Sequence, residues 1–392
     1  MNFLTRWLNK FRTGRILVNW MTGERAGGGS LRKNEIVSSI ANVIATNVGK
    51  LSPQVIRKNS AGTTIRNDSI SRLLELRPCR ECSTYDFLYR MASDLILYSD
   101  AFALIWWNAE YTQIERFQPI RASDVEIFEG TDGQLYMKFT WDYDEKVYTV
   151  PYIFVIHLKA RFNRKRFMGT SPDTDLATAA EMLDVTYEGI KNSIKKSASL
   201  RGYLKYTNIA DEEDLRQKVR EFQEAYMTAE NEGGLAGIDN SVEFKEITQA
   251  PRPIPMTQIS FFRENIYRYF GVSEKILTSS YSEQDWNSFY ESVIEPIAIQ
   301  LSMEFTFKVF TDRERGFGNR IVFTANRLQY ATLQTRASIG RDLFDRGVIT
   351  INEYRELMYL PEIEDGDVRM ISLNYVKADE QTAYQLGEGE KE

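Results

Sequence analysis

The sequence is poor in the residues that most enzymes use for catalysis. Its 392 residues contain a single histidine, His157, and two cysteines, Cys79 and Cys82. One histidine excludes a histidine-rich metal site, and any catalytic triad would have to be built around that imidazole. Because His157 lies at the end of a strand-like run, we expect a hydrogen-bonded structural residue. We predict no catalytic residue, no metal and no cofactor.

The two cysteines form a Cys-x-x-Cys pair directly after Pro78. A zinc site needs two further soft ligands, and the sequence has no second cysteine pair. A thioredoxin-type site would follow a buried strand, whereas this pair follows a predicted helix. Two cysteines do not make a disulfide framework in a chain of this length, so we expect folding in a reducing, intracellular compartment. An enzyme that uses Cys79 and Cys82 is therefore the weakest hypothesis.

Three other absences narrow the function. There is no G-x-x-x-x-G-K-[ST] loop, which argues against ATP hydrolysis. No run reaches the roughly 18 apolar residues that a membrane-spanning helix needs. The formal net charge of −6 argues against a broad grip on nucleic acid, because such binding comes from many lysine and arginine contacts with phosphates. An acidic chain is still compatible with DNA that slides past it.

What the sequence does have is length and apolar residues. Domains usually hold about 100–150 residues, so 392 residues predict two to four structural units. Hydrophobic residues make up 43% of the chain, with 22 phenylalanines, 21 tyrosines and 6 tryptophans. This composition is typical of a well-packed protein, and the aromatic content favours interfaces with other subunits.

The first twelve residues have an amphipathic helical pattern beside basic residues. The apolar stripe consists of Phe3, Leu4, Trp7, Leu8 and Phe11. A helix on a membrane surface has this pattern, and so does a short helix that docks on a neighbouring subunit. The glycine-rich stretch 23–30 follows, so we predict a flexible N-terminal segment over residues 1–34.

Residues 35–170 mix helical and strand-like patterns. Apolar residues at helical spacing predict helices after Asn34, over Ser69–Leu76 and from Ser83. Apolar blocks between 113 and 160, separated by turn residues, predict a small antiparallel β region packed on these helices. The fold class that follows is α+β.

The longest helical pattern extends from Pro172 to about Ser199. A compact insertion over 201–251 follows, in the order strand, helix, strand. A second helix then extends to Phe270, with Gly271 as its cap.

The rest of the chain is helical with polar interruptions. Residues 273–286 are polar and predict an exposed loop. The helix after them contains Pro296, which lacks a backbone donor and should kink it. Thr350 and Glu353 have capping-box spacing, and the acidic residues 377–392 predict a disordered tail.

Several stretches, in this order, resemble the portal proteins of long-tailed bacteriophages. They are Ala41–Val48 with Leu51–Pro53, Leu73–Pro78 with Thr84–Phe87, Asp100–Leu104, Met168–Pro172, Ile266–Val272 and Arg346–Arg355. Together they extend over about residues 35–367. The chain departs from the family pattern where Ser99-Asp100 replaces Gly-Asn, where Ser273 replaces a common proline, and where Cys79–Cys82 replaces a Pro-Asn turn.

The resemblance implies a ring, usually of twelve copies, at one vertex of the capsid, through which double-stranded DNA is packaged and ejected. It implies a multi-domain portal fold with a wing over 35–170 completed by 286–332, stem helices over 171–200 and 252–272, a clip over 201–251, a tunnel loop over 273–286 and a crown over 333–376. The partners implied are the terminase large subunit, a head–tail adaptor, and the major capsid or scaffolding protein. The expected location is the virion, after assembly in the host cytoplasm.

Between Tyr187 and Tyr206, five basic residues stand against one acidic residue. Lys191 and Lys195 are one helical turn apart, and Lys196 adjoins them. In a ring these lysines would repeat as a positive band near the DNA channel. An ordinary solvated helix face explains the same pattern equally well.

Two further groups of residues are candidates for contacts. The tunnel-loop candidates for sliding DNA contact are Lys275, Ser279, Ser280 and Gln284. A mobile surface loop is the plain alternative. The clip candidates for partner docking are Asp211, Glu212, Glu213 and Asp214. The preference of acidic residues for helix starts explains them equally well.

A portal subunit is the leading hypothesis. The alternative from another class is a peripheral membrane or scaffold-binding adaptor protein, anchored by the segment with Trp7 and Phe11. Imaging of the purified chain for rings distinguishes the two, as does liposome flotation with and without residues 1–20.

Overall fold

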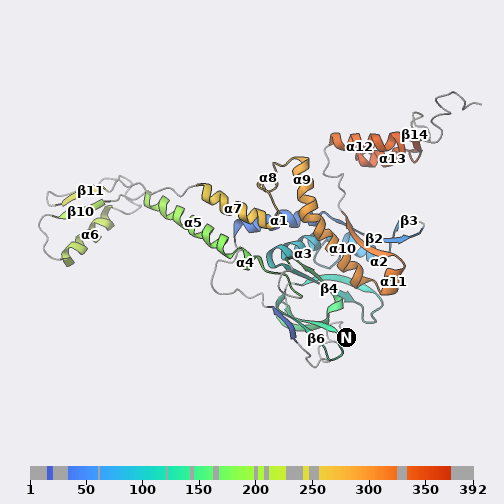
Figure 1. The fold of residues 1–392 in the computed structure, drawn as a ribbon, viewed down its shortest axis with the longest axis horizontal. Helices are drawn as coiled ribbons and strands as arrows, with labels where there is room; N and C mark the ends of the chain where they lie inside the picture. Colours follow the sequence, from blue (N-terminus) through green and yellow to red (C-terminus); the bar gives the residue numbers. More distant parts are fainter. Residues whose placement is uncertain are drawn as a thin grey trace, which may run out of the picture.

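The computed structural model describes residues 16–20, 34–60, 62–120, 122–141, 145–161, 167–197, 202–206, 212–226, 242–246, 256–324 and 333–371. Figure 1 shows three parts in these residues: a body of helices and sheets, a long arm, and a small C-terminal module. The body comprises the described residues of 16–161 and 272–324, the arm those of 172–270, and the C-terminal module residues 333–371. The mixture of helices and strands confirms the α+β class.

Helices α1 (Glu35–Gly49) and α3 (Thr84–Tyr98) pack against each other at the centre of the body. Each begins where the sequence supplies a cap. The Asn34 side chain caps α1, and Ser83 forms a capping box with Asp86 at the start of α3. Both helices carry apolar residues at three- and four-residue spacing, so their buried faces meet.

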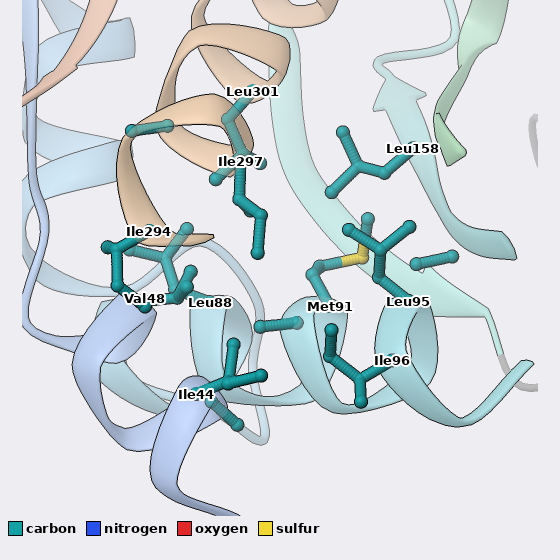
Figure 2. Close-up of a cluster of buried hydrophobic side chains, with 14 of the residues drawn as sticks. Ile44, Val48, Leu88, Met91, Leu95, Ile96, Leu158, Ile294, Ile297 and Leu301 are labelled. Atoms are coloured by element: carbon teal, nitrogen blue, oxygen red, sulfur yellow. The ribbon is translucent and has the colours of Figure 1, made fainter. Parts of the chain in front are cut away.

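Figure 2 shows the core that these helices share with the C-terminal part of the body. The labelled side chains from helices are Ile44 and Val48 of α1, Leu88, Met91, Leu95 and Ile96 of α3, and Ile297 and Leu301 of α10 (Glu295–Val309). Truncating one such buried residue to alanine typically costs about 2–5 kcal/mol. This core therefore fixes α10 on α1 and α3.

Strand β4 (Asp100–Trp107) is the central strand of an antiparallel sheet, between β5 (Ile114–Ile120) and β9 (Val155–Lys159). Successive side chains of a strand point to opposite faces. The residues that face the helical core are Ala101, Ala103 and Ile105, and those that face a second core are Phe102 and Leu104. The chain changes from helix to strand at Ser99.

The second core lies against an antiparallel sheet in the order β1-β6-β7-β8. Its strands are β1 (Ile16–Trp20), β6 (Ala122–Glu129), β7 (Leu135–Trp141) and β8 (Lys146–Pro151), and the 3₁₀ turn η2 (Tyr152–Phe154) leads from β8 to β9. The predicted antiparallel β region is confirmed, as two sheets. Flexibility over all of 1–34 is wrong for β1, because this apolar run pairs with the edge of β6 and satisfies its backbone groups. Residues 1–15 and 21–33 lie outside the described residues.

A third sheet joins the two ends of the body. Strand β2 (Ser52–Asn59) pairs antiparallel with β12 (Asn319–Thr324) and with β3 (Gly62–Ile65). The short helices α2 (Ser69–Leu76) and α11 (Asp312–Gly316) pack beside this sheet. Residues from distant parts of the sequence therefore fold as one unit.

Three helical segments follow one another without a break: α9 (Glu283–Phe289), the π-helical turn η3 (Tyr290–Ile294) and α10. Pro296 lies in the first turn of α10, and its missing N–H removes one helical hydrogen bond to the preceding turn. The widened turn lies directly before it. The predicted kink at Pro296 stays a prediction, and the structure shows a π-helical turn directly before this residue.

The arm consists of two helices and a small tip (Figure 1). Helices α5 (Ala177–Ser197) and α7 (Met256–Phe270) pack against each other. A single helix from Pro172 is wrong, because the short helix α4 (Pro172–Asp175) ends before Leu176, whose side chain is buried in the core of the body.

The tip lies at the outer end of the arm. Strand β10 (Gly202–Tyr206) pairs antiparallel with β11 (Val242–Glu246), and α6 (Glu212–Tyr226) lies between them in the sequence. The predicted order of strand, helix and strand is confirmed.

The C-terminal module contains α12 (Leu333–Asp345), β13 (Arg346–Thr350), α13 (Ile351–Leu357) and β14 (Arg369–Ile371), with β13 antiparallel to β14. The predicted capping box is confirmed, since the N–H of Glu353 donates to Thr350 Oγ1 at 3.1 Å and the N–H of Thr350 donates to Glu353 Oε2 at 2.7 Å. The predicted tail, 377–392, lies outside the described residues. Across the part of the chain that the structure describes, no helix combines the length and apolar character needed to cross a bilayer.

Candidate functional site

The arm begins at a buried carboxylate. Asp100, the first residue of β4, accepts hydrogen bonds from the backbone N–H of Gly169 at 2.9 Å (Oδ1) and 3.1 Å (Oδ2). Residue 169 has to be glycine, since a Cβ there would overlap the carbonyl oxygens of Ser99 and Ala160. Ser99 Oγ donates to the carbonyl oxygen of Thr170 at 2.6 Å. These bonds hold the residues that lead into α4 against the sheet.

Ser99 stands where the portal pattern has glycine. Its φ of 63° lies in the left-handed region, which a residue with a Cβ adopts at some cost in free energy. Besides the bond to Thr170, its carbonyl oxygen accepts a hydrogen bond from the N–H of Ala160 at 2.8 Å. The strained residue therefore links the end of α3 to both β9 and the arm.

His157 lies behind this carboxylate and is buried. Its Nε2 is 2.8 Å from Asp100 Oδ1, and its Nδ1 is 2.7 Å from the Tyr152 hydroxyl. Burial, and then the positive charges of Lys159 and Lys308, hold the pKa of His157 well below its usual range, so the ring is neutral near pH 7. A carboxylate only accepts hydrogen bonds, so Nε2 carries the proton and Nδ1 accepts from Tyr152. The expectation of a hydrogen-bonded structural histidine is confirmed.

Side chains of α10 satisfy the outer edge of β9. The backbone contacts are Gln300 with Lys159 at 2.9 and 3.3 Å, Glu304 with the N–H of His157 at 3.4 Å, and Lys308 with the carbonyl oxygen of Val155. A step of four residues along a helix covers about 6.0 Å, and a step of two residues along a strand covers about 6.6 Å. Every fourth side chain of α10 therefore lies opposite every second backbone group of β9. Lys308 also pairs with Glu304 at 2.8 Å, and burial lowers the pKa of Lys308.

The second arm helix is fixed at its C-terminal end. Gly271 ends α7 with a φ of 70°, as predicted. The Arg161 guanidinium lies 4.2 Å from the centroid of the Tyr269 ring and 4.9 Å from that of Phe270. The Tyr269 hydroxyl donates to Asp175 Oδ2 at 2.9 Å, which ties α7 to α4. Both arm helices therefore leave the body from one place, which we call the junction: Asp100, His157, Arg161, Gly169 and Tyr269.

The arm carries the predicted lysines. Lys191 is exposed on α5. Lys195 and Lys196 lie in the same helix, but their side chains are outside the described residues.

The predicted acidic docking residues lie at the tip. Glu213 and Asp214 are exposed in the first turn of α6, and Glu212 is its first residue. Asp211 is outside the described residues. Figure 1 places α6 at the outer end of the arm, away from α8 beside the body.

The exposure predicted for residues 273–286 is confirmed at most positions, but a loop without helices is wrong. The segment folds as α8 (Glu274–Leu277) and the first turn of α9. Ile276 and Trp286 are buried, and Ser282 forms a capping box with Asp285. Two apolar anchors and one cap outweigh the polar composition on which the prediction rested.

The four candidates in this segment have local roles in the structure. Lys275 Nζ pairs with Asp285 Oδ2 at 3.2 Å, which partly neutralises its charge. Ser279 has a φ of 57°, Ser280 Oγ lies 2.8 Å from Thr278 Oγ1, and Gln284 is exposed on α9.

Cys79 and Cys82 form a disulfide in the structure, with Cα atoms 5.5 Å apart. The bond links residues only three positions apart and builds no framework, and the reducing compartment stays a prediction. The N–H of Phe117 donates to the carbonyl oxygen of Pro78 at 2.8 Å, which holds the turn with both cysteines on β5. Within the described ranges, no group of three or more acidic, histidine or cysteine side chains is placed to hold a metal ion.

The sequence patterns did not predict the contact between Asp100 and Gly169 or the row of α10 side chains on β9. Asp100 and Gly169 are 69 residues apart, and no local pattern indicates that they meet. The row on α10 did leave a signal, because Gln300, Glu304 and Lys308 recur every four residues along the helix.

The chain is an α+β protein of several parts. These are a body with three sheets, a two-helix arm and a C-terminal module, and a buried polar junction holds the arm on the body. Residues 35–358 match the family model described as "Phage portal protein". The match covers most of the chain, so the chain belongs to the phage portal protein family, and the resemblance seen in the sequence is confirmed.

Individual relatives are distant. A probable portal protein of Lactococcus phage p2 is 26% identical over 204 residues, which cover 50% of this chain and 54% of that protein. The match thus spans about half the length of this curated relative. The neck of a native gene transfer agent particle computed with C12 symmetry has a TM-score of 0.60 at 14% identity, over 90% of this chain and 97% of that one. An HK97 family phage portal protein from Corynebacterium diphtheriae has a TM-score of 0.50 at 12% identity, over 78% and 99%. These structures share the fold.

Proposed function

We propose that the chain is the subunit of a phage portal, a ring of identical copies at one vertex of the capsid through which double-stranded DNA is packaged and ejected. The observation that carries this proposal is the family match over residues 35–358, which includes the body, the arm and most of the C-terminal module. The similarity of fold to a neck computed with C12 symmetry favours twelve copies. The chain acts by conduction and docking, with no enzymatic step of its own.

In this ring residues 35–170 and 286–332, which include most of the body, are the wing, and α5 and α7, within 171–200 and 252–272, are the stem. Residues 201–251 are the clip and 333–376 the crown. Both stem helices leave the wing at the junction, where Gly169 is bonded to Asp100 and Tyr269 of α7 is bonded to Asp175 of α4. This arrangement supports a stem that keeps its angle while DNA moves past it.

The DNA contacts we assign are weak and repeated. Lys191, Lys195 and Lys196 of each copy form a positive band on the stem. Contacts of this kind are screened by salt and carry no sequence information, which lets DNA slide. The segment 273–286 contributes polar contacts, and its one cation shares charge with a carboxylate.

The docking contacts we assign lie at the outer end of the arm. Glu213 and Asp214 are exposed there, next to Glu212 and Asp211. An acidic cluster on every copy forms a negative ring, which suits basic surfaces of the terminase large subunit and of a head–tail adaptor. The wing faces the capsid or scaffolding protein in the virion.

Native mass spectrometry and negative-stain imaging of the purified full chain test the proposal. We expect one discrete assembly of about twelve copies with a central opening. The experiment is repeated in the presence of the cognate scaffolding protein, because assembly of a ring can depend on other parts of the head. A chain that stays monomeric under both conditions contradicts the proposal.

A further inference from the structure

Three sides of helix α10 contact other parts of the same chain. Its core side buries Ile297, Leu301 and Phe305. A second side, with Gln300, Glu304 and Lys308, satisfies β9 as described above.

The third side satisfies the edge strand β12. The N–H of Phe323 donates to Ser302 Oγ at 2.9 Å, and the N–H of Ile321 donates to Thr306 Oγ1 at 2.9 Å. Helix α10 is therefore clamped between the outer edges of two sheets, and its rotation about its own axis is fixed.

The fourth side is apolar and exposed. Ile299, Met303 and Phe307 are 52%, 69% and 54% exposed, and Pro296 continues their row toward the start of the helix. With 3.6 residues per turn, this row lies opposite the core row of Ile297, Leu301 and Phe305. We call Pro296, Ile299, Met303 and Phe307 the α10 stripe. A helix that is apolar on opposite sides is usually buried on both, and a single copy of this chain covers one of them.

The stripe ends at an ordered polar residue. The Arg315 guanidinium lies 4.6 Å from the centroid of the Phe307 ring. It also donates to the carbonyl oxygen of Phe307 at 2.6 Å and pairs with Asp312, so its position is fixed. An apolar centre beside a polar, ordered margin is the usual anatomy of a protein–protein interface.

We propose that the α10 stripe packs against the neighbouring copy of this chain. This inference rests on the proposed ring, in which each copy presents two different surfaces to its two neighbours. A ring operation other than a two-fold axis never brings a surface onto itself, so the stripe meets a different surface of the next copy. The polar row beside the stripe holds one cation, Lys308, paired with Glu304, and Arg315 at the end of the stripe is paired with Asp312. The surroundings are therefore not the uniformly basic surface that a lipid surface or nucleic acid selects. A second protein surface therefore fits best, and the ring supplies one.

A charge placed in the stripe tests this inference. Met303→Glu sits at the most exposed position of the row, so the isolated chain should keep its thermal midpoint. In an apolar contact the same carboxylate is desolvated without a partner, and we expect the concentration needed for ring assembly to rise at least about tenfold. Met303→Leu, which keeps an apolar side chain of similar volume, is the matched control and should assemble like the wild type. Ile299→Glu, in the same exposed row, should repeat the effect.

Native mass spectrometry over a concentration series reads out the result. Rings of Met303→Glu and Ile299→Glu at wild-type concentrations overturn the inference and leave the proposed portal function intact. A wild-type chain that forms no ring, with or without scaffolding protein, overturns the proposed function and the inference with it. The two failures are therefore distinguishable.

A photo-crosslinking residue at position 303 tests the geometry. In wild-type-like rings we expect crosslinks from position 303 to a different segment of another copy. Crosslinks from 303 to 303 indicate a two-fold contact, and crosslinks to capsid or scaffolding protein alone assign the stripe to that partner. Either of these results overturns the inference.

Discussion

The body and the arm enclose their apolar residues to different extents. In the body, helices α1, α3 and α10 and strand β4 surround a common core, and buried polar groups at the junction have partners in the same chain. The arm has two helices that meet along one seam. That seam encloses Leu183 and Ile259, and the large apolar residues of the two helices that stay exposed include Met182, Val185, Tyr187 and Phe261. Two packed helices bury one face each, so the arm, like the α10 stripe of the body, keeps an apolar surface that the single chain does not cover.

Because of this difference, the stability of the single chain and the assembly of the ring should respond to different substitutions. Changes in the core of the body or at the junction should alter the free energy of unfolding of the single chain, whereas changes in the exposed α10 stripe should not. Changes on the outer faces of the arm should leave that quantity alone and alter assembly or DNA passage instead. The predictions below test this separation, from the largest expected effect to the smallest.

Gly169→Ala should give the largest loss of stability. The added Cβ meets two backbone carbonyl oxygens, which cannot rotate away as a flexible side chain can. We expect a loss of about 3 kcal/mol in the free energy of unfolding, measured by denaturant titration. Gly316→Ala is the control, because a Cβ there meets nothing within 4 Å, and its change should stay within about 1 kcal/mol. Equal losses in both variants contradict the role we give Gly169.

His157 should make the stability of the body depend on pH. Burial lowers the pKa of the folded histidine far below that of the unfolded one, so the unfolded chain binds one more proton below about pH 6.5. The free energy of unfolding should therefore fall as the pH drops below that value, by up to about 1.4 kcal/mol per pH unit. The measurement is urea unfolding at several pH values between 7.5 and 5.5.

His157→Asn is the matched variant for this experiment. His157 is the only histidine of the chain, and most carboxylates titrate below this pH range. The variant should be less stable at pH 7.5 because Asp100 and Tyr152 lose a partner. It should also lose most of the pH dependence. A slope equal to that of the wild type contradicts the assignment of a buried neutral imidazole.

Local signals in the sequence predicted local structure well. Thr350 with Glu353 predicted a helix start, and Gly271 predicted a helix end. The sequence pattern of residues 201–251 also predicted the strand–helix–strand order of the tip. Each of these features depends on residues within a few positions of one another.

Features that depend on distant partners were not predictable in this way. Strand β1 exists because β6, about a hundred residues away, offers a free edge. The segment 273–286 is folded because Ile276 and Trp286 find a core that other parts of the chain build. The disulfide of Cys79 likewise depends on the turn that β5 holds in place. The composition of a segment therefore does not show which distant residues it will contact, and these contacts determine its structure.

The arm lysines should show the smallest effect, and in a different measurement. Lys191→Gln, Lys195→Gln and Lys196→Gln together should leave the free energy of unfolding and ring formation unchanged, since α5 presents Lys191 to solvent. DNA packaging should fall a few-fold at low salt and approach the wild-type rate as salt rises, because exposed charges are screened over about 10 Å at 0.1 M. The control replaces three exposed lysines of the body, Lys50, Lys58 and Lys146, with glutamine. It removes the same net charge, so an equal loss of packaging in both variants would mean that overall charge, and not a band on the stem, acts on the DNA.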